Sequence, residues 1–398
     1  MRILAQHGFG AGERLERGLA DGLIDGVIYG AKDIAAGSVA EELREVARNH
    51  SAEVRLFDPQ YYACLVAAEP GARLGALAGT EGYPYFGTRR RRDLEREQQV
   101  ATDLESCLEY QRGLAVTGFI APNIVIRRSL DSVEATIAKD FLRNAAAVHE
   151  RLRDPRPLWA TLAISTDALR DRIELQNFLQ EVTELENPPS GIYLLIEHPD
   201  QEIPPTLEES DVLSRWMLIN RALTQSGYEV TNGYADLLAP YLGAAGATAA
   251  ASGWWNTLKV FSLKKFGPSP GGARQPVPRY ASAALLKSIR YTELESLRGG
   301  FPEVLNGDAA DAYYESGERP SGLEETLQNW TCLRRLAGLV VSGNAERTLS
   351  ACETALDRAE DIYARIGATG LTLRERSNQE HIQFIREELE AFSSLAEL

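Results

Sequence analysis

Eight short apolar segments alternate with amphipathic helical patterns along the first two thirds of the chain, and this alternation constrains the fold more than any other feature. A strictly apolar run such as Ile192–Ile196 is typical of a parallel strand that is covered on both faces. The segments predicted as strands are Arg2–Gly8, Gly26–Gly30, Glu53–Phe57, Ala115–Ile120, Leu158–Ile164, Gly191–Ile196, Val230–Thr231 and Thr248–Ala251.

Helical patterns separate these strands, and Ser38 and Asp167 are expected to cap two of the helices. Eight strand–helix units in roughly 250 residues are the count and length of a (β/α)8 TIM-type barrel. A doubly wound open sheet would show a similar alternation, but no GxGxxG follows the first strand and the count ends at eight. The clearest helical patterns are Gly12–Leu23, Val133–Leu152, Asp167–Leu185, Glu209–Ser226 and Asp236–Gly243.

The character of the chain changes after Thr292, and three regions are predicted. Residues 1–292 form the barrel with long loops after strands three and eight, the turn-rich segment 293–322 is a linker, and 323–398 is a small helical domain. Its three helices are expected at Leu323–Val341, Ala345–Ile366 and Thr372–Leu395, each with one apolar face. These faces are expected to pack on the barrel or against a second copy of the chain.

Composition narrows the class of protein. The formal net charge of −15 argues against non-specific nucleic-acid binding by the molecule as a whole. The four cysteines form no CxxC, so neither structural zinc nor a disulfide framework is expected. Met1 leads directly into a strand and Leu242–Ser252 is too short to span a membrane, so we expect a cytoplasmic protein without a membrane partner.

Polar residues follow almost every predicted strand, where the catalytic groups of a barrel enzyme lie. Glu197 comes directly after five apolar positions and suits a general acid or base, or a rim ion pair with Lys32. The other strand-end residues are Gln6, His7, Lys32, Asp33, Asp58, Asn123, Ser165, Thr166, Asp167, His198, Asn232, Tyr234 and Ser252.

Four of these residues are further catalytic candidates. His7 and His198 suit proton transfer near neutral pH, with a hydrogen-bonded rim histidine as the alternative. Lys32 could form a Schiff base if buried against apolar walls, or could pair with the next acid. Asp58 and Glu197 across the mouth would suit glycosidic cleavage. No cofactor is expected, although His7, Asp58, Glu197 and His198 could together bind a divalent metal.

A stretch free of acids, Leu237–Thr292, marks the expected ligand site, since the overall acid content would place about eight Asp or Glu there. Trp254 and Trp255 open it and suit stacking on a ligand. The basic side chains expected to bind an anion after strand eight are Lys259, Lys264, Lys265, Arg274 and Arg279. A solvated basic loop is the alternative interpretation.

A second basic cluster, Arg89–Arg92, lies in the long loop after strand three beside Tyr83, Tyr85 and Phe86. Two basic loops on one face would suit a polyanionic ligand. The following acids, Asp93 among them, could instead neutralise the arginines at a helix start.

These features predict an enzyme that acts on a phosphate-bearing substrate, a nucleotide or part of a nucleic acid, by hydrolysis or by glycosyl or base transfer. The partner would be an anionic small molecule or single-stranded nucleic acid. One alternative is a non-catalytic nucleic-acid or protein-binding module, which predicts a Glu197–Lys32 ion pair. Another is a divalent-metal hydrolase, which predicts His7, Asp58 and His198 within coordination distance.

Overall fold

The computed structural model describes most of the chain, and the elements below refer to that part. Three residues assigned above to a strand, a helix and the anion site, Glu53, Glu209 and Arg274, lie outside it. The described residues are 1–50, 54–79, 82–199, 211–268, 271, 277–315 and 317–397.

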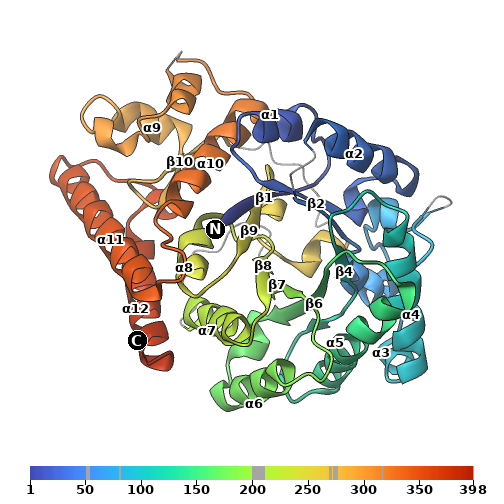
Figure 1. Ribbon diagram of the computed structural model, residues 1–398. Coiled ribbons are helices and arrows are strands. Elements are labelled where there is room, and N and C mark those ends of the chain that lie inside the picture. Colours follow the sequence, from blue (N-terminus) through green and yellow to red (C-terminus); the bar gives the residue numbers. More distant parts are fainter. Residues whose placement is uncertain are drawn as a thin grey trace.

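Parallel strands form a nearly closed barrel surrounded by helices, which confirms the predicted fold class (Figure 1). The hydrogen-bonded order is β3-β2-β1-β9-β8-β7-β6-β4, with β5 also paired to β6. The strands are β1 Arg2–Gln6, β2 Gly26–Gly30, β3 Val54–Asp58, β4 Phe119–Ala121, β5 Val125–Ile126, β6 Leu158–Ser165, β7 Gly191–Glu197, β8 Glu229–Asn232 and β9 Ala249–Ser252.

The seam between β3 and β4 is joined by a residue that precedes β4. Thr117 donates its backbone N–H to the Arg55 carbonyl at 2.8 Å. The Arg55 N–H in turn donates to the Thr117 hydroxyl oxygen at 2.9 Å. These bonds satisfy the edge of β3, so the barrel wall continues across the seam.

The fourth strand, predicted at Ala115–Ile120, begins only at Phe119. It consists of two short pieces, β4 and β5, separated at Pro122, which lacks a backbone donor. Asn123 replaces the missing ladder contacts by donating from Nδ2 to the Thr161 carbonyl at 2.8 Å and to the Ala138 carbonyl at 3.2 Å. This strand-end residue therefore stabilises the barrel wall.

Helices cover the outside of the barrel, and two of their starts differ from the prediction. Asp171, not Asp167, caps α6, because its carboxylate accepts the N–H groups of Ile173 and Glu174. Ser38 lies inside the first turn of α2. The helices are α1 Arg14–Ala20, α2 Ala36–Asn49, α3 Arg91–Leu94, α4 Glu97–Arg112, α5 Val133–Leu152, α6 Arg172–Thr183, α7 Val212–Gln225, α8 Ala239–Ala244, α9 Tyr291–Leu297, α10 Gly322–Ala337, α11 Ala345–Ala368 and α12 Glu380–Leu395.

The eighth helix of the barrel is α10, although the sequence pattern places this helix in the C-terminal domain. Figure 1 shows α10 between α8 and α1, where it completes the outer ring. Its fully buried Trp330 donates from Nε1 to the carbonyl of Ser252 at the end of β9, at 3.2 Å. The chain between β9 and α10 is therefore a long insertion within the barrel.

Part of that insertion is a β-hairpin, in a region whose sequence predicts a basic loop. Strands β10 (Arg279–Ser282) and β11 (Lys287–Arg290) pair antiparallel, and α9 follows directly. Gln328 of α10 fixes the hairpin, since its side-chain amide donates to the Ala281 carbonyl at 2.8 Å and accepts the Ala281 N–H at 2.9 Å.

The last two helices pack on the barrel, α11 against α8 and α12 against α7 (Figure 1). The apolar faces predicted for this region are thus buried within one chain. Among the described residues, no helix combines the length and the apolar character that a membrane crossing requires.

Glu388 connects α12 to the start of α7, and its loss is expected to destabilise the protein. Its carboxylate is buried and accepts the backbone N–H of Asp211 and, at 2.6 Å, that of Ser214. Glu388→Ala leaves both donors without this partner, which should lower the free energy of unfolding by about 2 kcal/mol in urea titrations.

The neighbouring Glu387→Ala is the matched control, because Glu387 is exposed and pairs with Gln383. We expect it to change stability by less than about 0.5 kcal/mol. Equal effects of the two variants would show that Glu388 does not fasten α12 to the barrel.

Candidate functional site

A buried carboxylate lies at the C-terminal end of the barrel, where β3 ends. Asp58 is 1% exposed and its Oδ1 accepts the backbone N–H of Gln60 at 2.9 Å. Its Oδ2 accepts the hydroxyl of Tyr62 at 2.9 Å and that of Tyr193 at 3.3 Å. Because Tyr193 comes from β7 on the other side of the barrel, these bonds span the barrel interior.

Burial raises the pKa of Asp58, while the Gln60 N–H and the positive charge of Lys265 act in the opposite direction. The Tyr193 hydroxyl also lies 3.2 Å from Oε1 of Gln6, so β1 belongs to the same network. This arrangement gives the barrel end a carboxyl group whose protonation responds to its surroundings.

Lys265 is the cation of this site, and it comes from the loop that follows β9. Its Nζ donates to the hydroxyl oxygen of Tyr234 at 2.7 Å. The ammonium group also lies 4.3 Å from the Tyr234 ring centre, 5.1 Å from that of Phe266 and 5.6 Å from that of Phe261. Since the side chain is 7% exposed, burial lowers its pKa to about 8.

Lys32 approaches the same aromatic wall from the loop after β2. Its Nζ lies 5.7 Å from the Phe266 ring centre, and its backbone N–H donates to Oε1 of Gln60 at 2.8 Å. Burial lowers the pKa of Lys32, Asp33 opposes this effect, and Arg73 lowers the pKa further. Two ammonium groups therefore face one ring, and an anion between them would offset their repulsion.

Arg73 binds the two long loops together over the barrel end. Its guanidinium donates to the carbonyls of Gly267 at 2.6 Å and Lys264 at 3.1 Å. Tyr62 packs edge-on against Phe261 and Phe266, which come from the loop after β9. The expectation that the loops after strands three and eight emerge on one face is met.

Glu197 lies at the end of β7, beneath the loop that follows β9. Phe261 forms a parallel bridge with it, and the His198 N–H donates to the Phe261 carbonyl at 2.9 Å. Glu197 is 1% exposed, and burial raises its pKa against the opposing charge of Arg127. The ion pair with Lys32 that a pure binding module predicts is not formed among the described residues.

Several buried polar atoms at the strand ends have no hydrogen-bond partner among the described residues. Leaving such atoms unpaired costs free energy, so they are candidates for contacts with a ligand. They are Nε2 of Gln6 at the end of β1, Nδ1 of His7 directly after that strand, and Oε2 of Glu197 at the end of β7. Ser165 at the end of β6 instead interacts with the Glu197 carboxyl group, whose pKa its side-chain hydrogen bond lowers against the effect of burial.

The two strand-end histidines are not matched to proton transfer at neutral pH. Burial lowers the pKa of His7 and that of His198 to about 4, so both rings are neutral at pH 7. The His7 ring packs 4.7 Å from that of Tyr29 and 5.8 Å from that of Trp254.

A metal site at His7, Asp58, Glu197 and His198 is not found in the geometry. Within the described ranges, no group of three or more His, Cys, Asp or Glu side chains is arranged to hold a metal ion. Asp58 is instead bound by Tyr62, Tyr193 and Gln60, as described above.

The basic residues predicted to bind an anion are not gathered at one place. Lys259 lies 3.8 Å from Asp236, and Lys264 is exposed. Arg279 lies in the hairpin and donates to the carbonyls of Ser288 and Arg376. Of the four predicted residues that the structure describes, the Lys265 side chain contacts the group around Asp58, Tyr62 and Tyr234. Arg274 lies outside the described residues.

The tryptophans after β9 form a separate feature beside β1. The indole N–H groups of Trp254 and Trp255 both donate to the Phe9 carbonyl, at 3.0 and 2.9 Å. The guanidinium of Arg14 lies over both rings. Trp255 and Phe9 are 38% and 76% exposed, so ligand stacking there stays a prediction.

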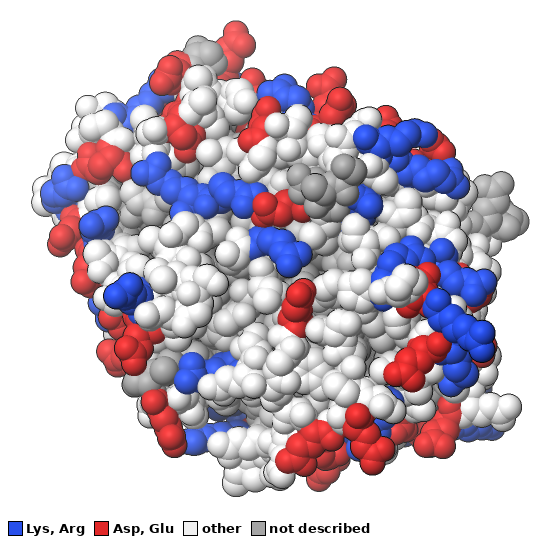
Figure 2. All heavy atoms as spheres, in the orientation of Figure 1, with Lys and Arg blue, Asp and Glu red and all other residues white. Residues whose placement is uncertain are grey.

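The arginine cluster after strand three is largely neutralised. Arg89 forms two bonds to the buried carboxylate of Asp103, at 2.7 and 3.0 Å, while Arg91 pairs with Glu95 and Arg92 with Asp93. On the face shown in Figure 2, basic and acidic side chains are likewise interspersed around the periphery. The alternative interpretation, a helix start that balances its own charge, describes Arg91 and Arg92, whereas Arg89 pairs with Asp103 further along in α4.

Three residues that hydrogen-bond to Asp58 could not be identified by the strand-end rule, namely Gln60, Tyr62 and Tyr193. Tyr193 was counted within an apolar strand, although a tyrosine buried in a strand needs a partner for its hydroxyl. By alternation it points to the same side as Glu197, and this spacing could have identified it.

Comparison with known proteins gives no assignment of family. No protein family and no curated protein matches the chain. Among solved structures, a family GH3 glycosyl hydrolase from Mycobacterium smegmatis is 14% identical, with 83% of this chain and 93% of that chain covered and a TM-score of 0.40. A family GH3 β-N-acetylglucosaminidase from Paenibacillus is 12% identical over 98% and 67% of the two chains, with a TM-score of 0.43. Dihydrodipicolinate synthase from Bacillus clausii is 13% identical over 98% and 97%, with a TM-score of 0.34. At this level of likeness, the barrel assignment rests on the strand order of the chain itself.

Proposed function

We propose that the chain is an enzyme that binds a small phosphate-bearing substrate at the C-terminal end of its barrel and transfers protons through Lys265. The observation that carries this proposal is the buried Lys265 ammonium on the Tyr234 hydroxyl, with Asp58 nearby. A buried amine whose pKa is about 8 can exchange a proton near neutral pH, whereas an ordinary lysine remains protonated.

Lys32 and Lys265 are proposed to bind the anion. Both ammonium groups face the Phe266 ring, and Arg73 adds positive charge beside Lys32. Because Arg89, Arg91 and Arg92 of the second basic cluster are paired with acids, these observations favour a small ligand, such as a nucleotide, over a nucleic-acid strand.

Asp58 and Glu197 supply two carboxyl groups at opposite parts of the barrel end. Hydrolysis and glycosyl or base transfer both need a proton donor and a proton acceptor. We assign the first proton transfer to Lys265 and keep Glu197, whose Oε2 has no partner among the described residues, as the second acid–base group.

Binding of inorganic phosphate, followed by isothermal titration calorimetry, tests the anion site. Lys32→Met should weaken phosphate binding by roughly tenfold or more, because a charge-assisted bond is lost. Lys139→Met is the control, since Lys139 lies on the outer helix α5 and pairs with Glu181. Nucleoside monophosphates and sugar phosphates would then be screened for turnover.

Equal phosphate affinity in wild type and in Lys32→Met would refute the anion site at the barrel end. Tighter binding of unphosphorylated sugars than of their phosphates would contradict the substrate class while leaving the proton-transfer site open to test.

A further inference from the structure

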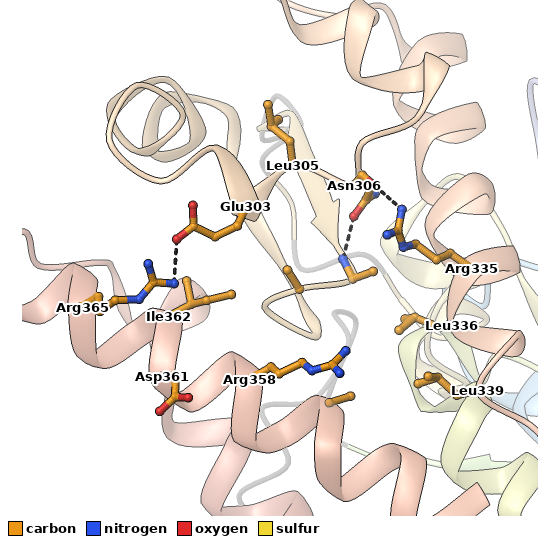
Figure 3. A pocket seen from close by; sticks show the side chains of 13 residues that line it. Glu303, Leu305, Asn306, Arg335, Leu336, Leu339, Arg358, Asp361, Ile362 and Arg365 are labelled. Carbon is orange, nitrogen blue, oxygen red and sulfur yellow. Dashed lines mark hydrogen bonds and ion pairs between the residues drawn. The ribbon is translucent and has the colours of Figure 1, made fainter.

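A cavity lies outside the barrel, between the hairpin region and the helices α10 and α11. Its volume is about 450 Å³, which is within the range of small-molecule sites. It is formed by the turn of the β10–β11 hairpin, the segment 303–306, and facing positions of the two helices (Figure 3).

The floor of the cavity is apolar. Leu336 lines it from α10 and Leu339 from the turn that follows this helix. Ala355 and Ile362 line it from α11, and Leu305 from the segment 303–306. Leu339, Ala355 and Leu305 are only half-buried, so apolar surface remains available to a ligand.

The charges around this floor favour an anion. Glu303 is neutralised by Arg365, with 2.6 Å between the carboxylate and the guanidinium. Arg335 donates one N–H to the Asn306 carbonyl. The Arg358 guanidinium has no hydrogen bond or ion pair within the described part of the chain.

Figure 3 shows how these groups are directed. Arg358 extends from α11 toward α10, while the carboxylate of Asp361 points away from it. Arg335 stands on the opposite wall. An incoming anion would therefore meet an unpaired guanidinium on one side and a second guanidinium on the other, above apolar side chains.

We propose that this cavity is a binding site for a small organic anion with an apolar body, such as the carboxylate of an aliphatic or aromatic acid. Arg358 binds the anionic group and the leucine-rich floor packs against the apolar part. The site is separate from the barrel end, and it spans the hairpin and the C-terminal helices.

The fluorescent aromatic sulfonate 8-anilinonaphthalene-1-sulfonate serves as the probe, with the full chain in solution. Arg358→Ala should weaken its binding by about tenfold or more through loss of a charge-assisted contact. Ala355→Trp should abolish binding by filling the floor. Octanoate should displace the probe, whereas sulfate, which lacks an apolar body, should not.

Two control variants separate this site from other surfaces. Arg347→Ala lies on the same helix but outside the cavity, and Lys32→Met lies at the barrel end; both should bind the probe like wild type. Circular dichroism would confirm that each variant is folded. Wild-type affinity in both Arg358→Ala and Ala355→Trp would overturn the proposal, and so would displacement by sulfate as effective as that by octanoate.

Discussion

Replacing Lys265 with methionine is expected to stabilise the protein while removing its activity. The displacement of the Lys265 pKa from 10.5 to about 8 corresponds to about 3 kcal/mol against the charged form. Loss of the hydrogen bond to Tyr234 destabilises the variant by about 1 kcal/mol and offsets part of this gain. Lys265→Met should therefore raise the free energy of unfolding by about 2 kcal/mol at pH 7, measured by urea denaturation.

The stability that Lys265→Met gains over wild type should decrease as the pH rises. Between about pH 8 and pH 10.5 the unfolded chain holds a proton on Lys265 that the folded protein has released, so wild-type stability rises with pH across this window. Below pH 8 both states are protonated and the full cost of the buried charge is present. The advantage of Lys265→Met should thus be largest below pH 8 and should disappear toward pH 10.5.

Turnover should change in the opposite sense to stability. Loss of a proton-transfer group lowers kcat by roughly 100-fold or more. Lys139→Met, on the outside of α5, should keep turnover and change stability by less than about 1 kcal/mol. A Lys265→Met protein that is less stable than wild type at pH 7 would show that the ammonium supports the fold, and would remove this reason to assign it to catalysis.

Removing Arg89 is expected to cost far more stability than removing Arg91, two positions along. Asp103 is 3% exposed and accepts two bonds from Arg89, one from Gln99 and one from the Tyr61 hydroxyl. Arg89→Ala leaves that buried carboxylate without its counter-charge, which should cost about 3 kcal/mol. Arg91→Ala breaks an exposed pair with Glu95 and should cost about 0.5 kcal/mol or less.

Chemical denaturation of both variants measures the difference. The double variant Arg89→Ala/Asp103→Asn should recover part of the loss, because no unpaired charge remains. Similar small losses for Arg89→Ala and Arg91→Ala would mean that the whole cluster is a solvated surface and is free to meet a polyanion after all.

The strands could be predicted from the sequence because burial on both faces leaves continuous apolar runs. The strand predicted at Gly26–Gly30 has the bounds of β2. The strand predicted at Gly191–Ile196 ends one residue before the end of β7. The position of α10 could not be predicted in this way. Its contact with the barrel depends on Trp330 reaching the end of β9 across an insertion, and no local pattern shows that.

The candidate site was predicted in part. The strand-end rule places Asp58, Lys32 and Glu197 at one end of the barrel, because parallel strands end together. Which lysine is buried was not predictable, since Lys264 and Lys265 are neighbours and differ only in the direction that the turn gives them. Likewise, Arg89 meets Asp103 through the packing of α4, which a charge count along the chain cannot show.

The separation of β9 from its helix has a consequence for synthesis of the chain. When the eighth strand has left the ribosome, the surface between α1 and α8 still has no cover, and it stays uncovered until α10 has been made. A fragment that ends at Thr292 would expose the apolar site that Trp330 fills, including the close contact with Gly18. Residues 1–292 therefore lack the helix that covers this part of the barrel, and the barrel is completed late, by a segment that the sequence pattern assigns to a different domain.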